Sequence, residues 1–236
     1  MMVALGNFFF RHRNSLFPLA FLIVLLPGPR IFDDPLLAAA VGCVVAIAGQ
    51  VLRGATIGLQ YIVRGGRDRR VYAADMVTDG VYAHCRNPMY VGNLLILVGV
   101  GLASNGWICI AVAVPLFASI YVAIVAAEEA YLLQRFGAAF EDYMHAVPRW
   151  IIRFKGLGST VSQSRFHWRR AVVKEYGTPF GWVMGLFALA LWNLWHAGQW
   201  TSRAQAVDAL CVGMLVTVVI WAVIRSLKKS RALVAD

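Results

Sequence analysis

Residues 88–129 read PMYVGNLLILVGVGLA, then SNG, then WICIAVAVPLFASIYVAIVAA, then EE, and this stretch decides the fold class. It contains two apolar runs, 88–103 and 107–127, which are separated by a three-residue polar turn. A helix of roughly 20 mostly apolar residues is long enough to cross a bilayer. The stretch therefore predicts a tight hairpin of two membrane helices, whose free ends return to the same side at the same depth.

Four residues of this hairpin carry local expectations. Pro88 suits the first position of a helix, where its missing N–H would have no partner anyway. Pro115 cannot donate an intrahelical hydrogen bond, so we expect a kink in the second helix. Gly92 and Gly99 lie seven residues apart, a spacing that lets a neighbouring helix approach closely; a cofactor role is the alternative for Gly92.

The whole chain is rich in apolar residues and poor in charged ones. Of its 236 residues 60% are apolar and 14% are charged, and the mean hydropathy is +0.65. Soluble domains usually carry about 25% charged residues. Apolar blocks occupy residues 15–26, 36–52, 88–103, 107–127, 178–195 and 204–224. We therefore predict an all-α fold, a polytopic integral membrane bundle of about six transmembrane helices.

The basic residues predict the orientation of this bundle. With the N-terminus in the cytoplasm, all 22 Lys and Arg residues except Arg30 and Arg203 fall on the cytoplasmic side. The positive-inside rule expects this imbalance for six spans with both termini cytoplasmic. The net charge of +10 is then assigned to anionic membrane lipids and not to nucleic acid. No small-residue cleavage site follows the first block, so we expect a retained helix and not a signal peptide.

Polar segments divide the chain. Residues 53–87, with RGGRDRR in their middle, are basic and rich in glycine, which predicts a loop. Residues 128–145 form an amphipathic segment that leaves the second hairpin helix. Residues 153–174 are interpreted as a basic linker. We thus expect a core at 1–157, followed at 158–236 by this linker and a C-terminal transmembrane hairpin whose role the sequence leaves open.

Polar side chains gather at both free ends of the central hairpin. Around the start of its first helix are Tyr82, His84, Arg86, Asn87 and Tyr90, and at the end of its second are Glu128 and Glu129. Adjacent acids at the end of an apolar span are costly without partners, which favours a functional pocket. The alternative is that the acids only mark where the helix leaves the membrane. The four cysteines and five histidines are scattered, so we expect neither a metal site nor a disulfide framework.

The residues at both ends also form an extended pattern. Residues 77–92 read VTDGVYAHCRNPMYVG, residues 128–137 read EEAYLLQRFG, and residues 147–150 read VPRW. They resemble the signature V-T-x-G-x-Y-x-x-x-R-[HN]-P-x-Y-x-G, E-E-x-x-L-x-x-x-F-G and V-P-R of the isoprenylcysteine carboxyl methyltransferase and phospholipid methyltransferase superfamily. The resemblance covers about residues 74–152, and the chain from 178 onward has no counterpart in the core pattern.

This resemblance implies a membrane-embedded methyltransferase, with S-adenosylmethionine in a cytoplasmic pocket and a lipophilic substrate that enters from the bilayer. The residues that it implies for cofactor binding are Ala74, Asp75, Met76, Val77, Tyr82, Asn87, Pro88, Met89, Tyr90 and Glu128. Carboxylates and aromatic faces suit the cationic groups of this cofactor, and carboxylates also accept from its hydroxyls. His84 and Cys85 fall at variable positions of the pattern and receive no role.

Two further residues are expected to act in catalysis. Glu129 completes the acidic pair and is the candidate base for an amine acceptor. Arg86 is expected to hold the cofactor carboxylate or to pair with Glu128, and a headgroup anchor is its alternative role. Alignment of the reacting atoms and exclusion of water would supply most of the catalysis.

Departures from the pattern bear on the acceptor. Asn87 stands where many members have histidine, although the phospholipid branch also shows N-P-M-Y, and Phe140 replaces a usual tyrosine. Ile124 stands where the isoprenylcysteine branch has an arginine that holds the substrate carboxylate. We therefore favour a phospholipid amine or another neutral nucleophile. The alternatives are an isoprenylcysteine-type carboxyl methyltransferase, a sterol-reductase-like NADPH enzyme and a non-catalytic membrane scaffold; the oligomeric state is left open.

Overall fold

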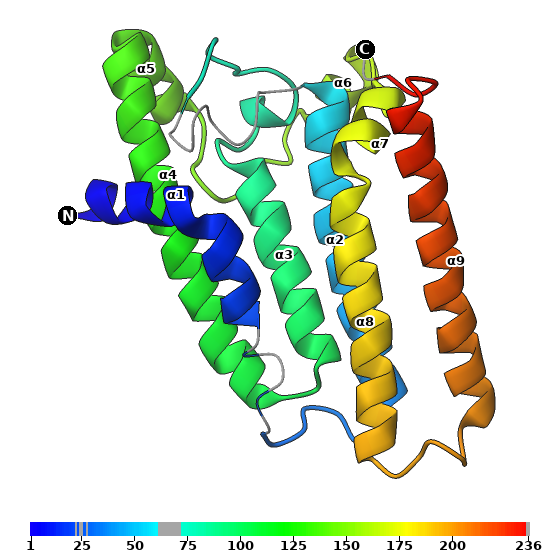
Figure 1. The fold of residues 1–236 in the computed structure, drawn as a ribbon. Helices are drawn as coiled ribbons and strands as arrows, with labels where there is room; N and C mark the ends of the chain where they lie inside the picture. Colours follow the sequence, from blue (N-terminus) through cyan, green and yellow to red (C-terminus); the bar gives the residue numbers. More distant parts are fainter. Residues whose placement is uncertain (22, 24–25, 27, 61–71, 235–236) are drawn as a thin grey trace.

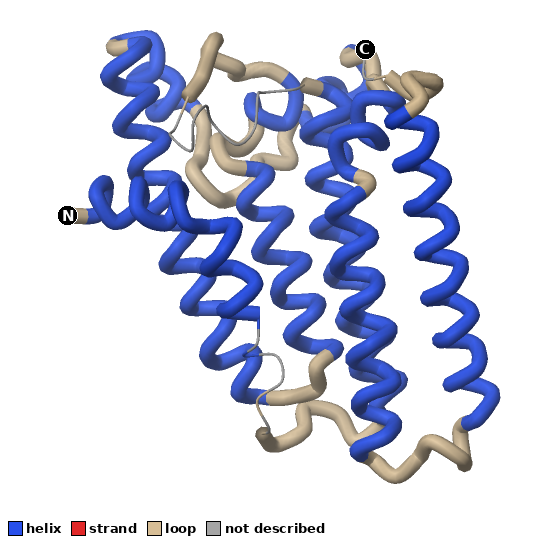
Figure 2. Tube along the Cα trace, viewed as in Figure 1, coloured by secondary structure: helices blue, strands red, loops and turns tan. Residues whose placement is uncertain are grey.

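The computed structural model describes residues 1–236 except 22, 24–25, 27, 61–71 and 235–236. Within the described residues the chain is helical and contains no named strand, as Figure 2 shows. The helices are α1 Met2–Phe21, α2 Pro35–Leu59, η2 Gly80–Ala83, α3 Pro88–Ala103, η3 Cys109–Ala113, α4 Val114–Phe136, α5 Ala138–Ala146, α6 Leu157–Gln163, α7 Trp168–Glu175, α8 Gly177–His196 and α9 Ala204–Lys229. The prediction of an all-α fold is confirmed.

Long helices lie side by side, and the short helices α5, α6 and α7 gather at one end of the bundle (Figure 1). Among the described residues, four stretches are long and apolar enough to cross a membrane: Pro35–Leu59, Cys109–Phe136, Gly177–His196 and Ala204–Lys229. The helix α3 is apolar but shorter. The chain is thus an all-helical membrane protein with four candidate spans, and the count of six spans and the cytoplasmic placement of the termini stay predictions.

The first helix differs from its predicted bounds. α1 begins at Met2, well before the apolar block 15–26, and the last part of that block lies partly outside the described residues. Figure 1 shows the start of α1 lying across the bundle before the helix turns to run beside α4. Gly6 allows this close contact, because a Cβ there would stand 2.9 Å from the Ala127 Cβ.

The predicted central hairpin is present. Pro88 opens α3, and Asn105 turns the chain with a φ of 59°. The Asn105 side chain accepts hydrogen bonds from the backbone N–H groups of Ile31 (3.1 Å) and Phe32 (2.8 Å) and donates to Phe32 O at 2.9 Å. This buried side chain therefore ties the connection between α1 and α2 to the turn between α3 and α4.

The second helix of the hairpin is longer than expected. A π-helical turn, Cys109–Ala113, immediately precedes the turn that contains Pro115. In a π-turn the backbone hydrogen bonds span one residue more than in an α-helix, and helices often kink at such turns. α4 then continues through both acids to Phe136 and ends at Gly137, whose φ is 54°. The segment 128–145 is therefore not one amphipathic helix, because Gly137 separates the last turns of α4 from α5.

The spacing of glycines on α3 has the packing role that the sequence predicts. A Cβ on Gly99 would stand 2.5 Å from Gly42 O, and a Cβ on Gly49 would stand 2.6 Å from Gly92 O. The helices α2 and α3 thus touch backbone to backbone at two levels, through Gly42 with Gly99 and through Gly49 with Gly92. Small residues at helix contacts are a common way to build a membrane bundle.

Two predicted polar segments were assigned wrongly. α2 continues to Leu59, so Arg53 lies inside a helix and not in a loop, and the basic run 64–70 lies outside the described residues. The supposed linker 153–174 contains α6 and most of α7. One of its basic residues, Arg170, donates to Ile57 O and Gly58 O, both at 2.9 Å, at the end of α2.

The C-terminal helices pack on the core through α8. Leu186 and Leu189 join a buried cluster with Ile96 and Val100 of α3. α9 packs against α8 and leaves most of its apolar surface exposed, as expected for a helix that faces lipid. The division of the chain at residue 157 stays a prediction.

Candidate functional site

The two polar clusters of the central hairpin meet at one end of the bundle. Tyr90, in the first turn of α3, donates its hydroxyl hydrogen bond to Glu128 Oε1 of α4 at 2.8 Å. The Tyr90 ring also packs against Tyr121, with 5.2 Å between the ring centroids. One acid of the pair is therefore held by an aromatic side chain from the facing helix.

The second acid is held by two arginines. Glu129 Oε1 lies 3.3 Å from Arg86 Nε, and Glu129 Oε2 accepts from Arg149 Nη2 at 2.5 Å. Arg86 thus pairs with Glu129 and not with Glu128, which was one of its two predicted partners. Two guanidinium groups face one carboxylate here, so this half of the site carries an excess of positive charge.

Backbone hydrogen bonds fasten the two motifs to each other. Arg86 N donates to Pro148 O at 2.9 Å, and Arg153 N donates to His84 O at 3.0 Å. The side chain of Asn87 donates to Arg149 O at 3.1 Å. The segment before α3 therefore lies along the segment after α5, which explains how residues about 60 positions apart assemble one site.

The residues next to the motif have structural partners. The His84 ring lies between Arg153 O and Thr160 Oγ1, each at 2.8 Å. Cys85 is fully buried, and burial raises the pKa of its thiol. Tyr143 donates to Tyr82 O at 2.8 Å, and burial also raises the pKa of the Tyr143 hydroxyl, which keeps it a neutral donor. These contacts hold the loop that carries the motif.

The predicted cofactor residues differ in exposure. Tyr82, Asn87, Pro88 and Met89 are buried, while Tyr90 and Glu128 are half-buried. The segment 74–77 is more exposed, and Arg135 donates to Ala74 O at 3.1 Å, which places the segment beside the last turns of α4. The structure thus brings together the residues at 82–90 and 128, whereas Ala74 lies beside Arg135, near the end of α4. Their role in cofactor binding stays a prediction.

Polar atoms without a hydrogen bond concentrate at this site. Among the described residues, four buried side-chain atoms have no hydrogen-bond partner, and three of them are Arg86 Nε, Glu129 Oε1 and Arg149 Nε. Buried polar groups in proteins are nearly always hydrogen-bonded, so each exception needs an explanation. Arg86 Nε and Glu129 Oε1 face each other as an ion pair at 3.3 Å, so Arg149 Nε is the atom that a polar ligand would satisfy.

Two basic residues of the site were not predicted. Arg149 belongs to the quoted VPRW segment, so the sequence signal for it was available. Arg13 of α1 lies close enough for its charge to act on Glu128 and Tyr90, and no motif pointed to it. In the described part of the chain, no three His, Cys, Asp or Glu side chains lie together as metal ligands.

Comparisons with known proteins agree with the location of these motifs. A family model described as phospholipid methyltransferase matches residues 36–139. The chain is 30% identical over 152 residues to the nickel-cobalt-cadmium resistance protein NccN of Alcaligenes xylosoxydans xylosoxydans, an alignment that covers 63% of this chain and 68% of that protein.

Two shorter alignments cover about a third of each protein. The chain is 35% identical over 78 residues to the cobalt-zinc-cadmium resistance protein CzcN of Cupriavidus metallidurans, covering 33% of this chain and 36% of that one. It is 32% identical over 73 residues to the protein-S-isoprenylcysteine O-methyltransferase of Schizosaccharomyces pombe, covering 31% of each. No solved structure matches the chain.

Proposed function

Since the chain belongs to the phospholipid methyltransferase family, we propose that it transfers a methyl group from S-adenosylmethionine to a lipophilic acceptor that arrives through the membrane. The observation that carries this proposal is the pair of adjacent acids, one bound by Tyr90 and the other by Arg86 and Arg149. The chain is a membrane protein of a methyltransferase family, and the donor and the acceptor are what we propose.

The charges around the site fit the proposed cofactor. Its sulfonium, α-amino group and ribose hydroxyls suit a carboxylate such as Glu128, and its own carboxylate suits a guanidinium. Arg86 and Arg149 both pair with the Glu129 carboxylate, so one positive charge is left unbalanced and is available to the carboxylate of the cofactor. Arg149 Nε, which is buried and has no hydrogen-bond partner, supports the same placement.

Residues already held by the fold would bind the cofactor. We propose Tyr82, Asn87, Pro88, Met89, Tyr90 and Glu128 as its side-chain contacts, and 74–77 as backbone contacts. Asn87 is fixed by its hydrogen bond to Arg149 O, and Tyr90 by its hydrogen bond to Glu128. Side chains that are positioned before a ligand arrives lose little freedom on binding.

The bound cofactor would supply an electrophilic methyl group. The acceptor's electron pair forms a bond to the methyl carbon while the carbon–sulfur bond breaks and its electron pair stays on sulfur. The chain's part is to align the reacting atoms and exclude water, and the burial of Asn87 and Met89, each 9% exposed, supports exclusion. An amine acceptor must also lose a proton, and Glu129, whose Oε1 would have to exchange its ion pair with Arg86 for the acceptor, is the proposed base.

The surroundings of Ile124 favour a neutral acceptor. Ile124 is 1% exposed and packs in an apolar cluster with Phe10 and Tyr121. This turn of α4 therefore offers no charged group to hold a substrate carboxylate. A phospholipid amine fits such a site better than the carboxylate of an isoprenylcysteine does. This holds although a protein-S-isoprenylcysteine O-methyltransferase of Schizosaccharomyces pombe is one of the similar proteins.

We further propose that the site faces the cytoplasm. The segments that hold most of the basic residues lie at the end of the bundle where the two motifs meet, whereas Arg203 pairs with Asp34 at the opposite end. Cytoplasmic segments of membrane proteins carry an excess of Lys and Arg. With this orientation, six spans would place both termini in the cytoplasm.

The first test is calorimetric titration of S-adenosylmethionine and S-adenosylhomocysteine into detergent-purified protein. We expect binding by the wild type, loss of binding in Glu128→Ala, and no change in Glu141→Ala, which removes an exposed acid of α5. Binding justifies a screen of native lipid extract with a radiolabelled methyl donor to find the acceptor. Folded protein that binds neither compound would contradict the proposal, and binding of NADPH instead would favour a reductase.

A further inference from the structure

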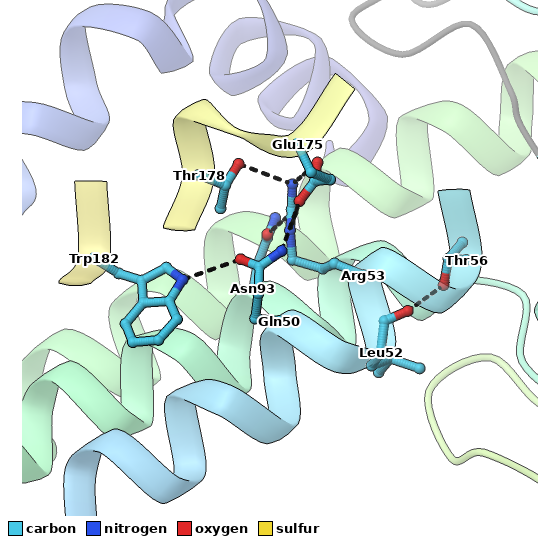
Figure 3. Close-up of polar contacts among 8 residues, drawn as sticks. All are labelled: Gln50, Leu52, Arg53, Thr56, Asn93, Glu175, Thr178 and Trp182. Atoms are coloured by element: carbon cyan, nitrogen blue, oxygen red, sulfur yellow. Dashed lines mark hydrogen bonds and ion pairs between the residues drawn. The ribbon is translucent and has the colours of Figure 1, made fainter. Parts of the chain in front are cut away.

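Arg53 is a buried arginine in the apolar helix α2, and polar side chains surround it (Figure 3). Its side chain is 7% exposed, and that of Glu175, the last residue of α7, is 5% exposed. Arg53 Nε donates to Glu175 Oε2 at 2.9 Å, and Nη2 donates to Oε1 at 2.7 Å. A bidentate pair of this kind fixes the orientation of the guanidinium as well as balancing its charge.

The polar groups next to this pair are also matched. Gln50 donates to Glu175 Oε2 at 3.2 Å and accepts from Trp182 Nε1 at 3.0 Å. Thr178 Oγ1 accepts from Arg53 Nη2 at 3.3 Å. An apolar pair of similar volume would hold helices together as well or better, so stability alone is a weak reason for a buried ion pair. What the pair adds is a fixed geometry.

Gly92 of the family signature provides the space for Arg53. A Cβ on Gly92 would stand 2.6 Å from Arg53 Cγ and 2.9 Å from Gly49 O. Because Gly92 has no side chain, the arginine stem passes close to α3, and its Nη1 donates to Asn93 Oδ1. The signature glycine thus lets a charge on α2 reach a polar side chain on α3.

Asn93 continues the contacts toward the proposed site. Its side chain lies beside the Tyr121 hydroxyl of α4. The Tyr121 ring packs on the Tyr90 ring, and Tyr90 donates to Glu128. A contiguous series of contacts therefore runs from Glu175 on α7, through α2 and α3, to Glu128 on α4.

We propose that Arg53 and Glu175 are positioning residues, which hold Asn93 and, through the two tyrosines, fix the Glu128 carboxylate. This inference rests on the proposed function, because it gives the C-terminal segment a part in cofactor binding. Glu175 lies outside residues 36–139, which match the phospholipid methyltransferase family, whereas Arg53, Asn93 and Glu128 lie inside. The segment after the family core therefore supplies the counter-charge that orients a residue of that core.

The test compares Glu175→Gln with Arg203→Gln in the full chain in detergent micelles. Each variant removes one ion pair that ties the C-terminal segment to the α2 region, since Arg203 pairs at 3.2 Å with Asp34, the residue before α2. The protein is produced with fluorotyrosine in place of tyrosine. The Tyr90 resonance is then the one that disappears from the fluorine NMR spectrum in Tyr90→Phe. Calorimetry gives the affinity for S-adenosylhomocysteine, and thermal unfolding gives the stability.

We expect Glu175→Gln to shift or split the Tyr90 resonance and to weaken S-adenosylhomocysteine binding about 2- to 30-fold, the range for coupling through packed networks. Arg203→Gln should change neither. If Glu175→Gln lowers stability but leaves the Tyr90 resonance in place, the pair is structural and the positioning role is wrong. If the wild type binds no S-adenosylhomocysteine but the resonance still moves, the proposed function fails and the positioning stands.

A second variant keeps the test decisive if Glu175→Gln does not fold. Asn93→Ala leaves the ion pair intact and interrupts the contacts between Arg53 and Tyr121. We expect it to move the Tyr90 resonance as Glu175→Gln would. An unmoved resonance in folded Asn93→Ala overturns the proposal.

Discussion

Replacing Gly99 with alanine tests how α2 and α3 are held together. A Cβ at this position would stand 2.5 Å from Gly42 O and 2.6 Å from Ala46 N. Both are backbone atoms, which cannot rotate away as a side chain can. Contact at 3.4 Å requires the helices to separate by roughly 0.9 Å along this line. Overpacking of this kind costs about 1–3 kcal/mol.

Gly185→Ala on α8 is the matched control, because no atom lies within 4 Å of a Cβ there. Both substitutions put alanine in place of glycine in an apolar helix, and each gains about 1 kcal/mol of intrinsic helix propensity. That gain cancels in the comparison. We therefore expect Gly99→Ala to be less stable than Gly185→Ala by about 1–3 kcal/mol, which is the steric cost alone.

The assay is reversible unfolding in mixed micelles of dodecyl maltoside and dodecyl sulfate, followed by far-ultraviolet circular dichroism. The free energies of unfolding of the two variants and the wild type are compared at one micelle composition. Equal values for the two variants, within about 0.5 kcal/mol, would refute the backbone contact between α2 and α3, because that scatter is typical of surface substitutions.

Three further outcomes are expected. Tyr90→Phe removes the hydrogen bond to its acidic partner and should weaken S-adenosylhomocysteine binding about 2- to 13-fold in calorimetry; unchanged affinity would remove Tyr90 from the site. Arg149→Ala leaves Glu129 with one arginine and should weaken S-adenosylhomocysteine binding about tenfold or more. Tighter binding would instead show that Arg149 competes with the ligand for Glu129. The hydrogen bond from Leu36 N lowers the pKa of Asp34, so its contribution to stability is present above about pH 4 and is lost as the pH falls below that value. Asp34→Asn keeps the helix cap and should flatten this acid loss in thermal unfolding curves, and an unaltered curve would assign the loss to other groups.

The sequence predicts the parts of the fold that depend on neighbouring residues. Two apolar runs joined by a three-residue turn must return their ends to one side, so the meeting of Tyr90 with Glu128 follows from the hairpin. The close approach of a neighbouring helix at Gly92 and Gly99 also follows from residue size and spacing, and the structure identifies that helix as α2. In both cases the signal lies within one short stretch of the sequence, residues 88–129.

The partner of Arg86 does not follow from such local rules. Glu128 and Glu129 are adjacent on one helix, so their side chains point about 100° apart around its axis. Which carboxylate faces the arginine depends on how α4 is rotated against the segment before α3, and packing sets that rotation. The prediction consequently named the wrong acid as a partner for Arg86.

The ion pair of Arg53 was missed for a different reason. Its partner Glu175 is 122 residues away, and no local pattern links the two positions. Arg53 was instead grouped with the basic residues that follow α2, and the helix around Glu175 was interpreted as part of a linker because of its charges. Because both side chains are buried, their charges pair with each other and not with solvent or lipid headgroups. Tertiary packing decides this burial, and no local pattern predicts it.

The cap at the end of α2 has a consequence for synthesis. The carbonyl groups of Ile57 and Gly58 accept from Arg170, which is 113 residues beyond Ile57 in the chain. At about 5–20 residues per second, a ribosome takes about 6 to 23 s to make the intervening chain. During that interval water or lipid headgroups must donate hydrogen bonds to these carbonyl groups. The last turn of α2 therefore acquires Arg170 as its native partner only late in translation, after α3 and α4 have been made.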